Sequence, residues 1–116
     1  MERLLIVEDD EIGRMVLWEL LSDQYDCDLA FNGEEAIEKL GADEYGHVLL
    51  DLMMPKVDGF GVMDYLRNSG RTPGPSVIVL TGDHREETKQ KCLDAGAKAF
   101  LHKPYRLKDI LSALAT

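Results

Sequence analysis

The sequence predicts a three-layer α/β fold made of five consecutive β-α units, and three observations support this prediction. Four short apolar runs, at residues 4–7, 48–50, 77–80 and 99–101, are continuous rather than alternating, as expected of parallel strands buried on both faces. Segments with apolar residues at helical spacing lie between these runs. Glycine-containing turns separate the strand candidates from the helix candidates. This alternation favours a parallel sheet with right-handed crossovers and helices on both faces.

The first two units are each defined by a strand candidate and the segment after it. The run at 4–7 precedes a helix candidate whose apolar residues form one stripe: Ile12, Met15, Val16 and Leu20. The next strand candidate, at 26–30, alternates aspartates with Cys27 and Leu29, so we expect an edge strand with one wetter face. Asn32-Gly33 then marks the turn into the second helix.

The last three units follow the same plan. The third helix carries an apolar stripe of Phe60, Met63 and Leu66, and the fifth, at 105–115, carries one of Leu107, Ile110, Leu111 and Leu114. The fourth helix begins near Glu86 and ends before Gly96, which we expect to cap it in the left-handed conformation. No linker or repeat interrupts the order, so residues 1–116 form one domain.

Composition limits the classes of partner. The chain is 45% hydrophobic and 30% charged, enough for a core, and its formal net charge is −9. Such a surface repels phosphate backbones and anionic lipid, so we expect no direct nucleic-acid or membrane binding. No apolar stretch is long enough for a signal peptide or a membrane span. Cys27 and Cys92 form no CxxC pair and are interpreted as free thiols, which points to a reducing cytoplasm.

Polar residues follow the strand candidates at the edge where open parallel sheets bind ligands. Glu8, Asp9 and Asp10 follow the first run, and Asp51 follows the third. Thr81 and Lys103 come just after the fourth and fifth. Taken singly, each has an ordinary role: Asp9 or Asp10 as a helix cap, Thr81 as a β-branched strand residue, Lys103 as a surface lysine. Their convergence on one edge predicts a binding site.

The acidic residues at this edge predict a divalent cation. Two carboxylates ~5 Å apart at an effective dielectric constant of ~20 repel by roughly 3 kcal/mol. Glu8, Asp9 and Asp51 form three such pairs if they converge, so either one stays protonated or a cation binds among them. Oxygen ligands without His or Cys select Mg²⁺, with Mn²⁺ as a substitute. An ionised aspartate beside such an ion is able to attack phosphorus without a general base.

These residues make the chain similar to the receiver domain of two-component response regulators over its whole length. The matching segments are LLIVEDD at 4–10, LLDLMMPKVDGF at 49–60, VIVLTG at 77–82 and AFLHKP at 99–104. The resemblance implies a flavodoxin-like, doubly wound (βα)₅ sandwich with strand order 2-1-3-4-5. It also implies phosphoryl transfer from a sensor histidine kinase or phosphotransfer protein in a phosphorelay.

The resemblance assigns roles at the acidic cluster. Asp51 is the expected phosphoacceptor. Asp9 and Asp51 are expected to bind Mg²⁺ through their side chains, Met53 through its backbone carbonyl, and Glu8 through a water molecule. The chain is then not an enzyme in its own right, because it is a phosphoacceptor that assists its own phosphorylation and dephosphorylation.

The resemblance also assigns switch residues. Thr81 and Lys103 are expected to contact the phosphoryl group, and the bond before Pro104 is expected to be cis. Thr81 is expected to move together with Phe100, which replaces a tyrosine common in the family, although Phe100 also fits a core strand position. This movement biases the face of the fourth helix, fifth strand and fifth helix toward effector proteins or domains, or toward a homodimer.

Two positions modulate the lifetime of the phosphoryl group in this family, and here they are Met53 and Asp83. Met53 is unable to orient water, whereas Asp83 either orients water or caps the helix that begins near Glu86. The alternative function is a pseudo-receiver that binds proteins without being phosphorylated. The sequence leaves open the effector, the kinase, and whether the chain is a stand-alone receiver or part of a larger protein.

Overall fold

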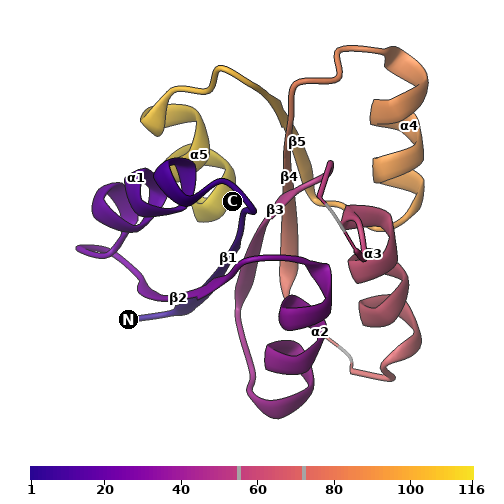
Figure 1. Ribbon diagram of the computed structural model, residues 1–116, viewed down its shortest axis with the longest axis horizontal. Coiled ribbons are helices and arrows are strands. Elements are labelled where there is room, and N and C mark those ends of the chain that lie inside the picture. The colour runs from indigo at the N-terminus through magenta and orange to yellow at the C-terminus, as the bar shows by residue number, and fades with distance from the viewer. Residues whose placement is uncertain (55, 72) are drawn as a thin grey trace.

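The computed structural model describes residues 1–54, 56–71 and 73–116. Five strands form one parallel sheet in the order β2-β1-β3-β4-β5 (Figure 1). The strands are β1 (Arg3–Val7), β2 (Asp26–Ala30), β3 (His47–Asp51), β4 (Ser76–Thr81) and β5 (Ala99–His102). The helices are α1 (Glu11–Leu21), α2 (Gly33–Ala42), α3 (Gly59–Asn68), α4 (Glu86–Asp94) and α5 (Leu107–Ala115). The predicted α/β class, the five β-α units and the strand order are confirmed, and the strand with alternating aspartates lies at an edge.

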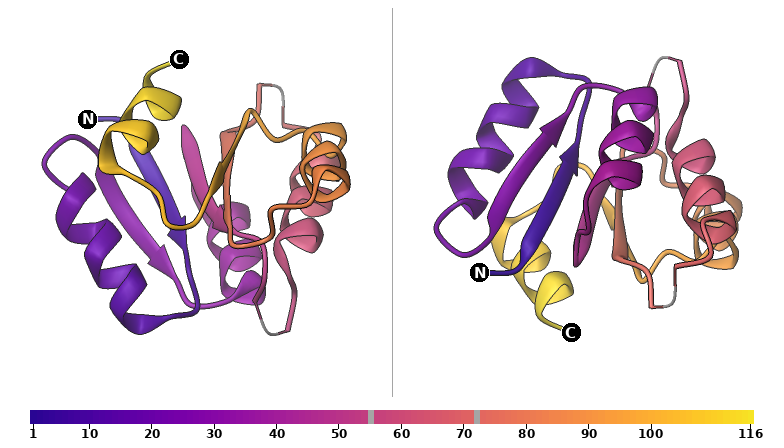
Figure 2. Two further views of the ribbon diagram at one scale, coloured as in Figure 1. Left: turned by 90° about the horizontal axis from the view of Figure 1, so that it is seen from above. Right: turned by 90° about the horizontal axis from the view of Figure 1, so that it is seen from below.

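The helices cover the two faces of the sheet unequally. Helices α1 and α5 pack on one face, and α2, α3 and α4 pack on the other (Figure 2). Neighbouring residues of a strand therefore enter different cores: Leu4 packs under α1 and α5, whereas Leu5 packs under the other three helices. Burying such side chains stabilises the fold by about 1.5–3 kcal/mol each. This burial on both faces is the physical reason for the continuous apolar runs.

The apolar stripe at residues 12–20 predicted a helix, and α1 confirms that prediction, but the stripe is not the buried face of the helix. Ile12, Met15, Val16 and Leu20 point to solvent, with exposed fractions from 74% down to 37%. The helix instead buries Leu17 and Leu21, one turn apart on its opposite side. Helix α1 is apolar around most of its circumference, so spacing alone did not identify the buried face. By contrast, the predicted stripes of α3 and α5 do pack against the cores.

Local capping fixes where the helices begin and end. The Asp10 carboxylate accepts a hydrogen bond from the Gly13 backbone N–H at 2.8 Å, which assigns the α1 cap to Asp10 rather than Asp9. Asn32 and Asp58 cap α2 and α3 in the same way. Gly96 has φ of 106°, so it adopts the left-handed conformation predicted for it after α4.

Both cysteines are buried free thiols, as predicted. Burial raises the pKa of the Cys27 thiol to about 11 and also raises that of Cys92, so neither is a reactive thiolate. Within the described ranges, no helix has the length and apolar character needed to cross a bilayer.

Candidate functional site

The carboxyl ends of four strands bring the predicted site residues to one edge of the sheet. Glu8 and Asp9 follow β1, Asp51 is the last residue of β3, and Thr81 is the last residue of β4. Lys103 follows β5 directly, and its backbone N–H donates to the Thr81 carbonyl at 2.7 Å. Parallel pairing therefore determines the site, because the strands end close to one another at the same edge of the sheet.

The three carboxylates that the sequence singled out do converge. One ligand oxygen from each of Glu8, Asp9 and Asp51 lies within 4.8 Å of the others. Glu8 and Asp51 are buried, whereas Asp9 is exposed at the rim of the cluster. The cluster therefore has a buried inner pair and an outer carboxylate open to solvent.

Lys103 supplies a positive charge to this cluster. Its Nζ atom lies 3.1 Å from Glu8 Oε1 and 3.4 Å from Asp51 Oδ2. The peptide bond between Lys103 and Pro104 is cis. One ammonium group does not neutralise three carboxylates, so the ionised cluster carries a net negative charge.

The protonation of the buried pair reflects this net negative charge. Burial raises the pKa of Asp51 to about 7, and the hydrogen bond and negative charge of Glu8 act in the same direction, while Lys103 opposes them. Burial also acts to raise the pKa of Glu8, but hydrogen bonds with Asp51 and Lys103 outweigh it and lower that pKa overall. Burial and the neighbouring Glu8 charge thus favour the protonated form of Asp51 when no cation is bound.

The donor set fits a hard divalent cation. The cluster offers carboxylate oxygens, without a His or Cys ligand among the described residues grouped there. A cation held there would take the place of a proton on Asp51, and oxygen ligands of this kind match Mg²⁺.

Thr81, at the end of β4, and Met53, in the loop after β3, lie next to the cluster. The Thr81 side chain is fully buried, and its Oγ1 accepts a hydrogen bond from the Asp83 backbone N–H at 3.1 Å. The Met53 backbone N–H donates to Asp51 Oδ1 at 3.3 Å, and its side chain is 69% exposed. Met53 therefore contacts Asp51 through its backbone and carries an exposed apolar side chain, while its effect on the phosphoryl lifetime stays a prediction.

The aromatic residue predicted to act as a switch packs half-buried on the side of α2, α3 and α4. The Phe100 ring meets His102 edge-on, with ring centroids 5.1 Å apart. His102 in turn stacks on His84, with centroids 4.1 Å apart and nearly parallel rings. Phe100 thus fits a strand residue packed on the core, while its role as a switch stays a prediction.

Asp83 contacts residues at the start of α4, although the cap position itself is Arg85 and has no side-chain cap hydrogen bond. The Asp83 carboxylate accepts hydrogen bonds from the Arg85 backbone N–H at 3.0 Å and from Thr88 Oγ1 at 2.8 Å. Hydrogen bonds from the Arg85 guanidinium hold the pKa of Asp83 well below its usual range. The carboxylate is therefore committed to the helix start and ionised at neutral pH.

Two arginines near the site were missed from the sequence. Arg14 Nη1 donates to the carbonyls of Glu8 at 2.9 Å and Asp9 at 3.3 Å, and its guanidinium lies over the Phe31 ring. Arg85 forms the contacts with Asp83 described above. Arg14 lies in the first turn of α1 and Arg85 directly before α4, so a cation at the start of a helix that follows an acidic residue is the shared signal.

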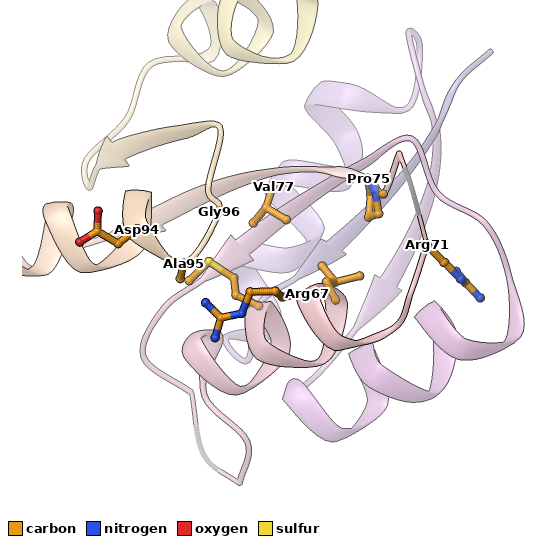
Figure 3. Close-up of a pocket in the computed structure, with 10 residues that line it drawn as sticks. Arg67, Arg71, Pro75, Val77, Asp94, Ala95 and Gly96 are labelled. Atoms are coloured by element: carbon orange, nitrogen blue, oxygen red, sulfur yellow. The ribbon is translucent and has the colours of Figure 1, made fainter.

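A cavity of about 270 Å³ lies far from this cluster, beside the start of β4 and the end of α4 (Figure 3). Val77 and Gly96 line it, and the Arg67 guanidinium lies near Ala95. Arg71 points away from the other lining residues and donates to carbonyl groups at the end of α2. This cavity therefore belongs to the opposite edge of the sheet.

The fold and the acidic edge together define a class of protein, and comparison with known sequences identifies it. Residues 4–115 match the response regulator receiver domain family. The chain belongs to this family, as the sequence motifs predicted, and is a receiver domain of the two-component type.

The relatives show how this domain is used elsewhere. The chain is 31% identical to the response regulator ArlR of Staphylococcus saprophyticus over 98% of its length, which is 51% of that protein. It is 34% identical to hybrid signal transduction histidine kinase B of Dictyostelium discoideum over 95% of its length, but only 6% of that protein. The chain thus spans about half of a curated response regulator and a small part of a hybrid kinase.

Solved structures agree with the fold. The chemotaxis protein CheY4 of Vibrio cholerae superposes with a TM-score of 0.91 at 27% identity, covering 99% of this chain and 97% of that one. A response regulator from Burkholderia pseudomallei, solved with a phosphorylated aspartic acid, a calcium ion and citrate, gives a TM-score of 0.87 at 27% identity. The alignment covers 98% of this chain and 66% of that one.

Proposed function

We propose that Asp51 is the phosphoacceptor of this receiver domain and that Mg²⁺ is needed for its phosphorylation. The donor is a phosphohistidine of a sensor histidine kinase or phosphotransfer protein, or a small phosphodonor. The observation that carries the proposal is the buried Asp51 carboxylate beside Glu8, Asp9 and the Lys103 ammonium group. The phosphorylated aspartic acid of the Burkholderia relative supports the same chemistry.

The residues present indicate how a metal ion would be held. Asp9 and Asp51 would bind it through their side chains, Met53 through its backbone carbonyl, and Glu8 through water. When bound, Mg²⁺ neutralises the carboxylates and the oxygens of the incoming phosphoryl group.

Asp51 forms the new bond. One Asp51 oxygen attacks phosphorus while the bond from phosphorus to the donor nitrogen breaks, and the histidine retains that electron pair. The product is an acyl phosphate on Asp51, so the chain accepts the group and assists its own reaction rather than acting as an enzyme on another substrate. The Lys103 ammonium and the Thr81 hydroxyl donate to the phosphoryl oxygens.

The consequence of phosphorylation is a change at the face formed by α4, β5 and α5. Thr81 ends β4 next to β5, and Phe100 lies on β5 itself, so movement of Thr81 toward the phosphoryl group affects this face directly. We propose that effector proteins or domains, or a second copy of the chain, bind there.

Incubation with phosphoramidate and Mg²⁺ followed by intact mass spectrometry tests the proposal. We expect the mass of one added phosphoryl group, because the complete set of Asp9, Asp51, Thr81 and Lys103 is retained. The matched control contains EDTA in place of Mg²⁺ and is expected to show the unmodified mass. An unmodified mass in both samples favours the pseudo-receiver instead.

The exposed apolar stripe of α1 is the proposed docking surface for a protein phosphodonor. Ile12, Met15, Val16 and Leu20 lie on the helix that begins directly after the acidic turn, so a partner bound there reaches Asp51. Glu11, Glu19 and Asp23 add negative charge to the same helix and the turn after it. The stripe therefore suits a helix with apolar and basic side chains.

Val16→Asp tests this docking surface. We expect transfer from a purified phosphohistidine-containing partner to slow by at least about tenfold, since a buried charge and lost apolar contact cost more than ~1.4 kcal/mol. Labelling by phosphoramidate is expected to remain at the wild-type rate, because Val16 is not part of the acidic cluster. Leu93→Asp, at an exposed apolar residue of α4, is the matched control and is expected to leave both rates unchanged. Equal slowing by the two substitutions would contradict docking through α1.

We also propose a cytoplasmic location for the chain and a type of effector for it. Two buried free thiols are consistent with a reducing cytoplasm. Because curated relatives extend beyond the matched region, we propose that the effector is either a separate protein or another domain of the same protein.

A further inference from the structure

The Asp83 carboxylate is held by a dense set of hydrogen bonds just after β4. Its Oδ1 accepts from the Arg85 backbone N–H at 3.0 Å and from Arg85 Nε at 3.1 Å. Its Oδ2 accepts from Arg85 Nε at 3.2 Å, from Arg85 Nη2 at 2.8 Å and from Thr88 Oγ1 at 2.8 Å. Both oxygens are therefore occupied, and the planar guanidinium determines their orientation.

The backbone of the same residue contacts the candidate functional site. The Asp83 N–H donates to the buried Thr81 hydroxyl oxygen at 3.1 Å. Arg85 thus reaches Thr81 through one intervening residue, although Arg85 itself lies on the surface at the start of α4. Fixing the Asp83 side chain fixes the backbone N–H that holds the Thr81 hydroxyl.

The turn has room to move when this contact is released. Asp83, Arg85 and Thr88 line a cavity of about 330 Å³ whose other walls include Leu52 and Met53, the two residues after Asp51. Gly82 borders open space: a Cβ at this position would have no atom within 4 Å apart from those of the adjacent residues, so the turn is not packed there. The observed position of the turn is consequently set by the hydrogen bonds of Asp83 and by the stack of His84 on His102.

We propose that Arg85 is a positioning residue for Thr81. Its guanidinium clamps Asp83 so that the Thr81 hydroxyl remains bonded to the Asp83 N–H instead of reaching toward a phosphoryl group on Asp51. The inference rests on the proposed function, in which Thr81 contacts that group. Removing the guanidinium lowers the cost of moving the turn and favours the phosphoryl-bound arrangement.

Beryllofluoride, a phosphoryl mimic, is the probe for this inference. We expect Arg85→Ala to bind beryllofluoride with Mg²⁺ about fivefold more tightly than wild type, equivalent to ~1 kcal/mol. Arg85→Lys retains the charge and is expected to restore part of the wild-type affinity. Because Asp83 transmits the effect, Asp83→Ala and the double substitution are expected to match Arg85→Ala rather than add to it.

Arg67→Ala is the matched control. Arg67 forms a comparable exposed ion pair with Asp64, at 2.7 Å on α3, and has no contact with Thr81 among the hydrogen bonds of the described residues. We expect this substitution to leave beryllofluoride affinity unchanged. A fivefold increase in Arg67→Ala as well would show a nonspecific charge effect and overturn the inference.

Hydrogen exchange of the Asp83 amide in metal-free protein separates this inference from the proposed function. We expect exchange to be several times faster in Arg85→Ala than in wild type, because the N–H loses the support of its fixed side chain. Unchanged exchange overturns the positioning role, whether or not beryllofluoride binds. Failure of wild type to bind beryllofluoride, with faster exchange in Arg85→Ala, refutes the proposed function and retains the clamp.

Discussion

Asp51→Asn is expected to eliminate Mg²⁺-dependent incorporation of a phosphoryl group completely. The amide has no anionic oxygen with which to attack phosphorus, and an acyl phosphate is not formed on it. Glu8 is the other buried carboxylate that could accept the group, but its Oε1 is engaged in an ion pair with the Lys103 ammonium group at 3.1 Å. The measurement is intact mass spectrometry after incubation with phosphoramidate and Mg²⁺, compared with wild type treated in parallel.

The fold is expected to survive this substitution. Asparagine has almost the same shape as aspartate. Its NH₂ group is able to donate to the Glu8 carboxylate, in place of the hydrogen bond that Asp51 and Glu8 form in wild type. Asp64→Asn, at an exposed carboxylate of α3, is the matched control and is expected to be labelled like wild type. Residual labelling of Asp51→Asn at the wild-type level would mean that another side chain is the acceptor.

The predictable part of the site follows from strand ends. Glu8, Asp51 and Lys103 are far apart in the sequence, yet each follows a continuous apolar run. Parallel strands buried on both faces end at a common edge, so the sequence placed these residues together before any distance was known. The alternative roles of Asp9 and Asp10 were separable only by geometry, since either has the side chain of a helix cap and Asp10 alone bonds Gly13.

Two features of the structure could not be predicted from the sequence: the buried face of α1 and the side-chain contacts of Arg85. In α1, apolar residues occupy several faces, and the choice of Leu17 and Leu21 for burial depends on how the helix crosses the sheet. The contacts of Arg85 with Asp83 depend on rotamers and on the turn after β4. Periodicity carries no information on either feature. Both are side-chain arrangements that require the assembled fold.

The stability of the metal-free protein is expected to fall as pH rises from about 4 to 7. Asp51 has an ordinary pKa of 3.8 and a folded pKa of about 7, so the folded state binds a proton that the unfolded state releases across this interval. Stability is therefore highest while Asp51 is protonated and is lost as the pH rises toward 7. The lowered pKa values of Glu8, Asp28 and Asp83 act oppositely, but below their ordinary values of 3.8 to 4.5.

Asp51→Asn isolates the contribution of this carboxyl group. A pKa increase of this size corresponds to at most ~4 kcal/mol, and the lowered pKa of Glu8 offsets part of it. We therefore expect the variant to exceed wild type in free energy of unfolding by roughly 2 kcal/mol at pH 8 and to approach it near pH 4. Urea unfolding in EDTA at the two pH values measures the difference. Parallel pH profiles for the two proteins would show that Asp51 does not retain its proton.

Added Mg²⁺ is expected to reverse this pH dependence in wild type and to do so far less in Asp51→Asn. A cation that binds the ionised Asp51 replaces the proton as the neutralising charge, and binding to the folded state alone raises its stability by mass action. At pH 8, Mg²⁺ at roughly 30 times its dissociation constant is expected to offset the ~2 kcal/mol that deprotonation of Asp51 costs. The buried pair of Glu8 and Asp51 therefore destabilises the metal-free protein once both are ionised. The same uncompensated negative charge favours binding of a cation beside Asp51, where we propose that the phosphoryl group is accepted.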